Sequence, residues 1–91
     1  MLDVVLSNQF KKDLKTAKKR GYDLELLNDV VDTLAHSTPL PLKNRDHELT
    51  GDYKGFRECH IQPDWLLIYR IDNDELFLFL SRTGTHSDLF S

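Results

Sequence analysis

The chain has 91 residues, 40% of them hydrophobic, and a formal net charge of −3 at pH 7. A chain of this length buries only about 60 to 65% of its unfolded surface and lacks apolar material for a second core, so we expect a single domain over residues 1–91. Its one cysteine, Cys59, excludes an internal disulfide and favours a reducing compartment, and the absence of a signal-peptide pattern or a long apolar run predicts a cytoplasmic protein without a membrane partner.

Residues 2–6 predict a short opening strand, and Ser7 is a typical cap for a helix that would end at Gly21. The buried stripe of this helix, spaced at i, i+4 and i+7, consists of Phe10, Leu14 and Ala17. Its remaining surface is basic and includes Lys11, Lys12, Lys15, Lys18 and Lys19. Residues 1–22 hold six Lys or Arg against two Asp, so a nucleic-acid partner is compatible with the negative net charge.

Asp23 can cap a second helix that reaches about His36. Its buried stripe consists of Leu24, Leu27, Val30, Val31 and Leu34. The short link between the two helices predicts an antiparallel hairpin. Residues 38–42 contain two prolines, which predicts a stiff, extended connector after the second helix.

The second half of the chain predicts a meander of three strands over residues 53–61, 65–71 and 76–82. Residues 76–80 are apolar on both faces, so the last strand is expected to be central. The predicted fold is α+β: an N-terminal strand, a helical hairpin, then a mainly antiparallel three-strand meander with both helices on one face. The opposite face should then be partly polar and open, which makes it the place to expect chemistry.

Several residues of the second half combine the side chains needed for acid–base chemistry, namely His47, His60, Asp64, Arg82 and His86. Taken singly, each has an ordinary structural reading as a turn, loop or strand-edge residue. Together, imidazoles and a carboxylate can remove a proton from one oxygen and deliver a proton to another oxygen. A guanidinium can stabilise a phosphorane. The group therefore predicts metal-independent RNA cleavage by attack of a ribose 2′-hydroxyl.

A zinc site is the competing interpretation, since three histidines and one aspartate are also a plausible ligand set. The spacing gives it little support, because no His-x-x-x-His pair lies on a predicted helix. We therefore predict no metal site and no cofactor.

The tail after the last strand predicts a short helix. Thr85 and Asp88 have the spacing of a capping box, which would begin the helix and place His86 and Phe90 on one face. Gly84 would permit the turn between the strand and this helix.

Four segments carry a resemblance to a known family: residues 46–51 (DHELTG), 53–57 (YKGFR), 59–69 (CHIQPDWLLIY) and 82–90 (RTGTHSDLF). They resemble the YafQ branch of the RelE toxin superfamily, the toxins of bacterial type II toxin-antitoxin systems. The resemblance covers nearly the whole chain. It implies a RelE-like microbial ribonuclease fold and an endoribonuclease that enters the ribosomal A site, cuts the mRNA there and halts translation.

The same resemblance implies roles for individual residues. It places His47, His60, Asp64 and His86 in the catalytic or mRNA-positioning set and makes Arg82 the phosphate-stabilising cation. Phe90 would orient the substrate, and Trp65 is assigned with it to substrate binding, although an apolar ring in a strand is also typical of a core. The five lysines of the first helix would dock on ribosomal RNA phosphates.

We favour His86 as general acid and either Asp64 or His60 as general base, with His47 holding the scissile phosphate or sharing the proton transfer. The roles of acid and base can also be interchanged. The implied partners are a cognate antitoxin, the 70S ribosome and mRNA, with operator DNA bound only through the antitoxin complex. Two alternatives share the fold: a ParE-like toxin that inhibits gyrase without nuclease residues, and a non-catalytic binding module.

Overall fold

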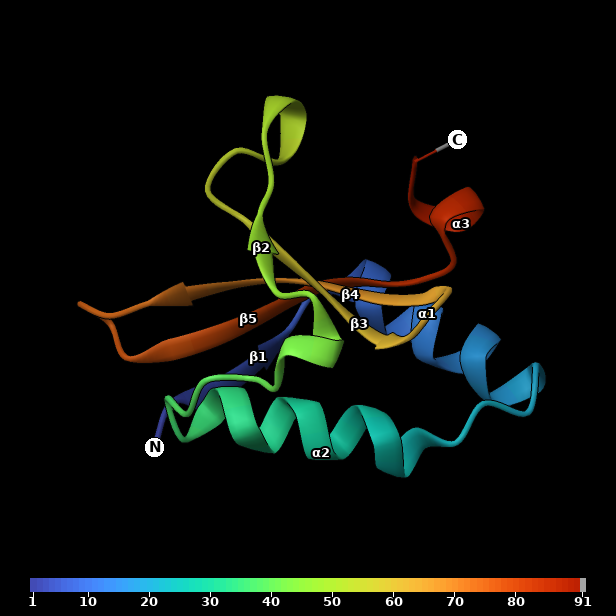
Figure 1. Cartoon of the computed structure of the whole chain (residues 1–91), viewed down its shortest axis with the longest axis horizontal. Coiled ribbons are helices and arrows are strands. Elements are labelled where there is room, and N and C mark those ends of the chain that lie inside the picture. Colours follow the sequence, from blue (N-terminus) through green and yellow to red (C-terminus); the bar gives the residue numbers. More distant parts are fainter. Residues whose placement is uncertain (91) are drawn as a thin grey trace.

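The computed structural model describes residues 1–90. Figure 1 shows a twisted sheet with α2 on one side, while the loop after β2 and α3 stand on the other side. In chain order the elements are β1 (Asp3–Leu6), α1 (Asn8–Lys19), α2 (Leu24–Ala35), β2 (His47–Glu48), β3 (Arg57–Gln62), β4 (Trp65–Asp72), β5 (Phe77–Gly84) and α3 (His86–Phe90). Two short 3₁₀ turns, η1 (Leu42–Asn44) and η2 (Gly51–Tyr53), flank β2.

Local signals place the helices where they were predicted. The Ser7 hydroxyl accepts a hydrogen bond from the Phe10 backbone N–H at 2.9 Å, and the Asp23 carboxylate accepts one from Glu25 at 3.0 Å. Gly21, just after α1, has a φ of +78°, a conformation that favours glycine. The two predicted helices are therefore confirmed, with caps that satisfy free N–H groups at the start of each helix.

The sheet has the strand order β1-β5-β4-β3-β2, with β1 parallel to β5 and every other pair antiparallel. The apolar strand β5 lies between β1 and β4, as its sequence predicted. The strand predicted over residues 53–61 begins only at Arg57, because η2 and Gly55, at a φ of +92°, interrupt the extended chain before it. The two-residue strand β2, which was not predicted, forms the far edge of the sheet.

The main core lies between α1, α2 and one face of the sheet. Alternate residues of β4 point into it, including Trp65, Leu67 and Tyr69, each at most 1% exposed. On the other face Leu66 and Ile68 pack with Leu89 of α3 and with residues of the loop around η2. The face predicted to be open is therefore partly covered, and the loop and α3 border the part that stays accessible.

Trp65 is part of this core, so the prediction that it binds substrate is wrong for this structure. It is 1% exposed, its ring lies 4.8 Å from that of Tyr22, and its Nε1–H donates a 2.9 Å hydrogen bond to the Thr83 hydroxyl. Strand alternation is the reason, because Trp65 shares the core face with Leu67 and Tyr69, whereas the next residue, Leu66, points to the opposite face.

Within residues 1–90, none of the helices has the length and apolar character needed to cross a bilayer.

Candidate active site

A row of paired residues crosses four strands on the face opposite α2. His47 on β2 pairs with Glu58 on β3, Glu58 pairs with Ile68 on β4, and Ile68 pairs with Arg82 on β5. Partners in an antiparallel pair have their side chains on the same face, and neighbouring strands lie about 4.8 Å apart. The sheet register therefore brings His47, Glu58 and Arg82 to one surface, although they are far apart in the sequence.

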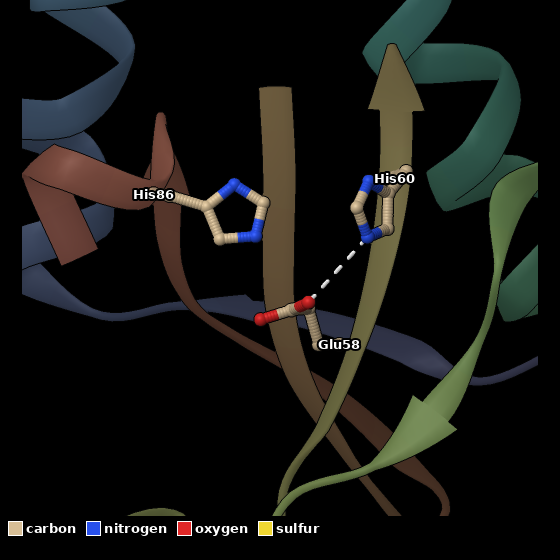
Figure 2. A group of neighbouring side chains, drawn as sticks. All are labelled: Glu58, His60 and His86. Carbon is tan, nitrogen blue, oxygen red and sulfur yellow. Dashed lines mark ion pairs between the residues drawn. The ribbon is translucent and has the colours of Figure 1, made fainter. Parts of the chain in front are cut away.

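Glu58 is the centre of this surface. Figure 2 shows its carboxylate and the rings of His60 and His86 pointing toward one another. The Oε1 atom of Glu58 lies 3.6 Å from Nε2 of His60 and 3.6 Å from Nε2 of His47, and the ring centres of His60 and His86 are 5.8 Å apart. Glu58 is 4% exposed. A buried carboxylate thus lies within reach of two imidazoles, with a third one beside them.

Sequence reasoning missed Glu58. The available signal was its spacing from His60: residues i and i+2 of a strand share a face, so any strand that presents His60 to the site also presents Glu58. Its partner His47 shares that face only through the pairing of β2 with β3, which the sequence did not predict.

The hydrogen bonds of two histidines define which nitrogen carries a proton. Nδ1 of His60 lies 3.1 Å from the Pro63 carbonyl, and Nδ1 of His47 lies 2.7 Å from the Arg45 carbonyl. A carbonyl only accepts, so Nδ1 is the protonated nitrogen in both rings. The Nε2 atoms therefore face the Glu58 carboxylate, and a proton held on either side makes that contact attractive. This is an arrangement suited to proton transfer.

His86 is the first residue of α3 and is held by Asp64 in the turn between β3 and β4. The Asp64 Oδ1 atom accepts hydrogen bonds from the His86 backbone N–H at 3.1 Å and from its Nδ1 at 3.0 Å. These two bonds, the backbone one first, lower the pKa of Asp64 below its usual value. An ionised Asp64 orients the imidazole and leaves Nε2 for a reacting group.

Arg82 is held by a buried carboxylate on α1. Asp13 accepts hydrogen bonds from Nε of Arg82 at 2.8 Å and from an Nη atom at 3.2 Å. The Asp13 contact raises the pKa of Arg82, with a smaller contribution from the Tyr53 hydroxyl. Arg82 is therefore a permanent cation, and its side chain stays partly exposed on the site face.

Phe90 is 47% exposed at the end of α3. Its ring centre lies 6.3 Å from that of His86 and 5.9 Å from that of Tyr53 in η2. The capping box predicted for this helix is confirmed: the Thr85 N–H donates to the Asp88 carboxylate at 2.9 Å, and the Asp88 N–H donates to the Thr85 hydroxyl at 3.1 Å. The exposed ring of Phe90 therefore lies beside His86 at the accessible part of the site.

A second network anchors the chain where it enters β2. Asp46 accepts hydrogen bonds from the Tyr69 hydroxyl and from Arg57, at 3.2 and 3.3 Å from the guanidinium. Asp46 raises the pKa of Arg57, and burial raises that of Tyr69. This network lines a hollow of about 960 Å³ that none of the site histidines borders. It holds the residue next to His47 without being part of the histidine cluster.

Cys59 lies between Glu58 and His60 in sequence but points to the opposite face. It is 0% exposed, and burial raises the pKa of its thiol to about 12. A buried, protonated thiol has no part in the chemistry of the site.

The five lysines Lys11, Lys12, Lys15, Lys18 and Lys19 are all exposed on α1. The histidine cluster lies on the face of the sheet away from the main core, so the structure does not bring these lysines into the cluster. They form a separate basic surface.

Glu58, His60 and His86 could together hold a metal ion, since one ligand atom from each lies within 4.8 Å of the others. This set differs from the zinc set that the sequence suggested. Carboxylate and imidazole donors suit zinc or copper, but two ligands of one tetrahedral zinc lie only about 3.4 Å apart. The three ligand atoms are spread over up to 4.8 Å, so the side chains would have to close up to hold an ion.

The fold and the site together define a small α+β protein with an acid–base cluster and an arginine on one sheet face. The chain belongs to the YafQ family: residues 2–91 match the family described as "Bacterial toxin of type II toxin-antitoxin system, YafQ". The family resemblance inferred from the four sequence segments is thereby confirmed.

Relatives and solved structures agree with this assignment. The chain is 45% identical over 89 residues to the mRNA interferase toxin YafQ of Escherichia coli K12, covering 97% of this chain and 95% of that protein. A metal-bound toxin from Helicobacter pylori is 52% identical, with a TM-score of 0.94 over 99% of this chain and 100% of the other. YafQ in the E. coli DinJ-YafQ toxin-antitoxin complex is 41% identical, with a TM-score of 0.89 and coverage of 99% and 98%. The chain is thus a homologue of mRNA interferases, and the predicted α+β fold is confirmed.

Proposed function

We propose that this protein is the toxin of a type II toxin-antitoxin system and acts as an endoribonuclease on mRNA in the ribosomal A site. One observation carries the proposal: a buried carboxylate, Glu58, faces His47 and His60, with His86 beside them and Arg82 in the same row of the sheet. The E. coli relatives are mRNA interferases by name.

In the proposed reaction, the pair of Glu58 and His60 takes the proton of a ribose 2′-hydroxyl. The 2′-oxygen then bonds to the adjacent phosphorus while the bond from phosphorus to the 5′-oxygen breaks. His86, oriented by Asp64, gives its Nε2 proton to the leaving 5′-oxygen. The products are a 2′,3′-cyclic phosphate and a 5′-hydroxyl, and the base and acid have exchanged one proton each with the substrate.

The remaining site residues act on the phosphate and the bases. Arg82 uses Nε and one Nη group for Asp13, which leaves N–H donors for a phosphorane oxygen. His47 lies on the other side of Glu58 and would contact the scissile phosphate or share its proton. Phe90 offers an exposed ring for a base next to the cleavage site.

We further propose that the five exposed lysines of α1 dock on ribosomal RNA phosphates, because such contacts are electrostatic and independent of sequence. A cognate antitoxin is expected, since the E. coli relative forms a complex with DinJ. Operator DNA would be bound only through that antitoxin complex, and the site of action would be the cytoplasm. A metal ion at Glu58, His60 and His86 would occupy the groups that transfer protons, so we expect it to inhibit.

Two alternatives remain from the fold: a gyrase inhibitor and a non-catalytic binding module. Neither needs the cluster around Glu58. To test the proposal, purified protein is added to a translation reaction and the mRNA ends are mapped by primer extension, with His86→Ala as the inactive control. Cuts in phase with A-site codons that vanish in the control support it. Intact mRNA, together with inhibition of purified gyrase in a separate supercoiling assay, would instead favour the gyrase inhibitor.

A further inference from the structure

Helix α1 holds the segment that carries Arg82 and His86. Strand β1 pairs with β5 only as far as Leu80, so beyond this point the β5 edge facing α1 has no strand partner within residues 1–90. Side chains from the start of α1 and from within it hydrogen-bond to this edge instead of a strand. The Ser7 hydroxyl donates to the Ser81 carbonyl at 2.7 Å, and Asp13 accepts from the Thr83 N–H at 3.1 Å. Unpaired backbone groups of the edge are thereby satisfied by α1.

Asp13 occupies a position on the inward side of α1, three residues after Phe10 and four before Ala17, both buried. It is only 9% exposed. Burying a carboxylate is costly unless it is paired and hydrogen-bonded, and an apolar residue at such a position is often as stabilising or more so. Asp13 holds the Nε side of the Arg82 guanidinium, so it determines where the remaining N–H groups point. The buried Asp13 is therefore explained by its effect on the position of Arg82, which a purely stabilising role would not require.

Arg20, the C-cap residue directly after α1, makes a second link to the tail. Its guanidinium donates to the two oxygens of Asp88 at 2.6 and 3.1 Å. Arg20 holds the pKa of Asp88 well below its usual range, so the pair stays charged at neutral pH. Asp88 is also the capping residue that bonds Thr85, one residue before His86.

The tail depends on such links, because α3 has only five residues and a helix this short is not stable alone. Arg20 and Asp13 are seven residues apart, close to two helical turns, so they project from the same side of α1. With Thr83, Gly84 and Asp88 they line a hollow of about 310 Å³ between α1 and the segment.

We propose that Asp13 and Arg20 are positioning residues for RNA cleavage: Asp13 acts through Arg82, and Arg20 acts through Asp88 on His86. The inference rests on the proposed function, since its main readout is mRNA cleavage. One rigid helix then carries a basic outer surface and, toward the sheet edge, the groups that align the catalytic segment.

The test compares Arg20→Gln, Arg20→Lys and Asp13→Asn with the wild type in single-turnover mRNA cleavage at saturating ribosome concentration. Lys43→Gln is the matched control, because Lys43 is exposed and the change removes the same charge. We expect Arg20→Gln and Asp13→Asn to lower the maximal rate about tenfold or more while the half-saturating ribosome concentration changes less. Arg20→Lys should recover part of the loss, and Lys43→Gln should match the wild type. Urea unfolding of each variant confirms that the measured protein is folded.

A wild-type maximal rate in both Arg20→Gln and Asp13→Asn would overturn the inference, as would an equal loss in Lys43→Gln. A second readout does not depend on cleavage: the NMR signals of the His86 imidazole should shift in Arg20→Gln and stay in place in Lys43→Gln. If the wild type cuts no mRNA, the proposed function fails and the role in RNA cleavage fails with it, while the His86 signals still decide whether Arg20 positions His86. Unchanged His86 signals in Arg20→Gln would then overturn it.

Discussion

Asp64 and His86 are joined by two hydrogen bonds to a single carboxylate oxygen, one from the backbone at 3.1 Å and one from the ring at 3.0 Å. The turn between β3 and β4 therefore fixes both the start of α3 and the orientation of its first side chain. The position and the tautomer of His86, the proposed acid, therefore depend on Asp64, which lies 22 positions earlier in the chain.

This bond predicts a pH dependence. The pKa of Asp64 is lowered in the folded state by the bonds from His86, so their contribution to stability is complete above its ordinary value of about 3.8. It is lost as the pH falls through the lower, folded-state pKa. An NMR titration should show the Asp64 carboxyl titrating below its ordinary pKa of 3.8, with the signal of the His86 backbone amide following the same step. A His86 amide signal that does not follow the Asp64 step would contradict the contact, and Asp64→Asn should remove the step.

Glu58→Gln tests the buried carboxylate. The amide keeps the size of the side chain but cannot accept a proton, so cleavage should fall about 100-fold or more. Single-turnover primer extension measures this loss. Glu48→Gln is the matched control on β2, because that side chain is 83% exposed and points away from the histidines, toward Arg57. If Glu58→Gln cleaves at the wild-type rate, Glu58 is not part of the general base.

Trp65→Phe separates core from substrate binding. The change removes the Nε1–H donor to Thr83 and part of a ring that is 1% exposed. We expect the free energy of unfolding to fall by about 1–3 kcal/mol, measured in urea, while folded protein retains its cleavage rate. The reverse result, normal stability with lost cleavage, would show that Trp65 binds substrate after all.

Gly84→Ala probes the turn into α3. A Cβ atom there would lie 2.8 Å from an Asp88 carboxylate oxygen, and Asp88 is held in place by Arg20 and Thr85. The tail must shift, so we expect cleavage to fall about tenfold or more. Gly21→Ala is the control: Gly21 also has a positive φ, of +78°, but a Cβ there would meet no atom of residues 1–90 within 4 Å. Equal losses of cleavage rate in both variants would attribute the effect to backbone strain alone.

The basic surface of α1 predicts a salt dependence. Replacing Lys11, Lys12 and Lys15 by Glu should weaken ribosome binding and flatten its dependence on salt, because fewer phosphate contacts release fewer counterions. Binding at several salt concentrations measures this slope. A wild-type affinity that does not change with salt would rule out docking through phosphates.

The helices could be predicted from the sequence because their signals are local. Ser7 and Asp23 cap them, Gly21 ends the first, and the apolar spacing defines the buried stripe, all within a few residues. The capping box of Thr85 and Asp88 was predictable for the same reason.

The strand at Arg57 was predicted too early because apolar and aromatic content does not report where the chain stops being extended. Residues 53–56 have the composition of a strand, yet η2 and Gly55 turn the chain before Arg57. The two residues of β2 are too few to produce a pattern at all. Strand ends depend on pairing with a neighbour, which composition does not contain.

The sequence by itself determined the fold class, the two long helices, the central place of β5, and a set of residues able to transfer protons and bind phosphate. Only the tertiary structure decided that Glu58 lies between His47 and His60, that Trp65 is a core residue, and that Asp13 and Arg20 hold the segment from Arg82 to Asp88. The physical reason is range. Caps and helical stripes form between residues a few positions apart, whereas a shared sheet face and a helix lying along a strand edge arise from pairing and packing between distant segments.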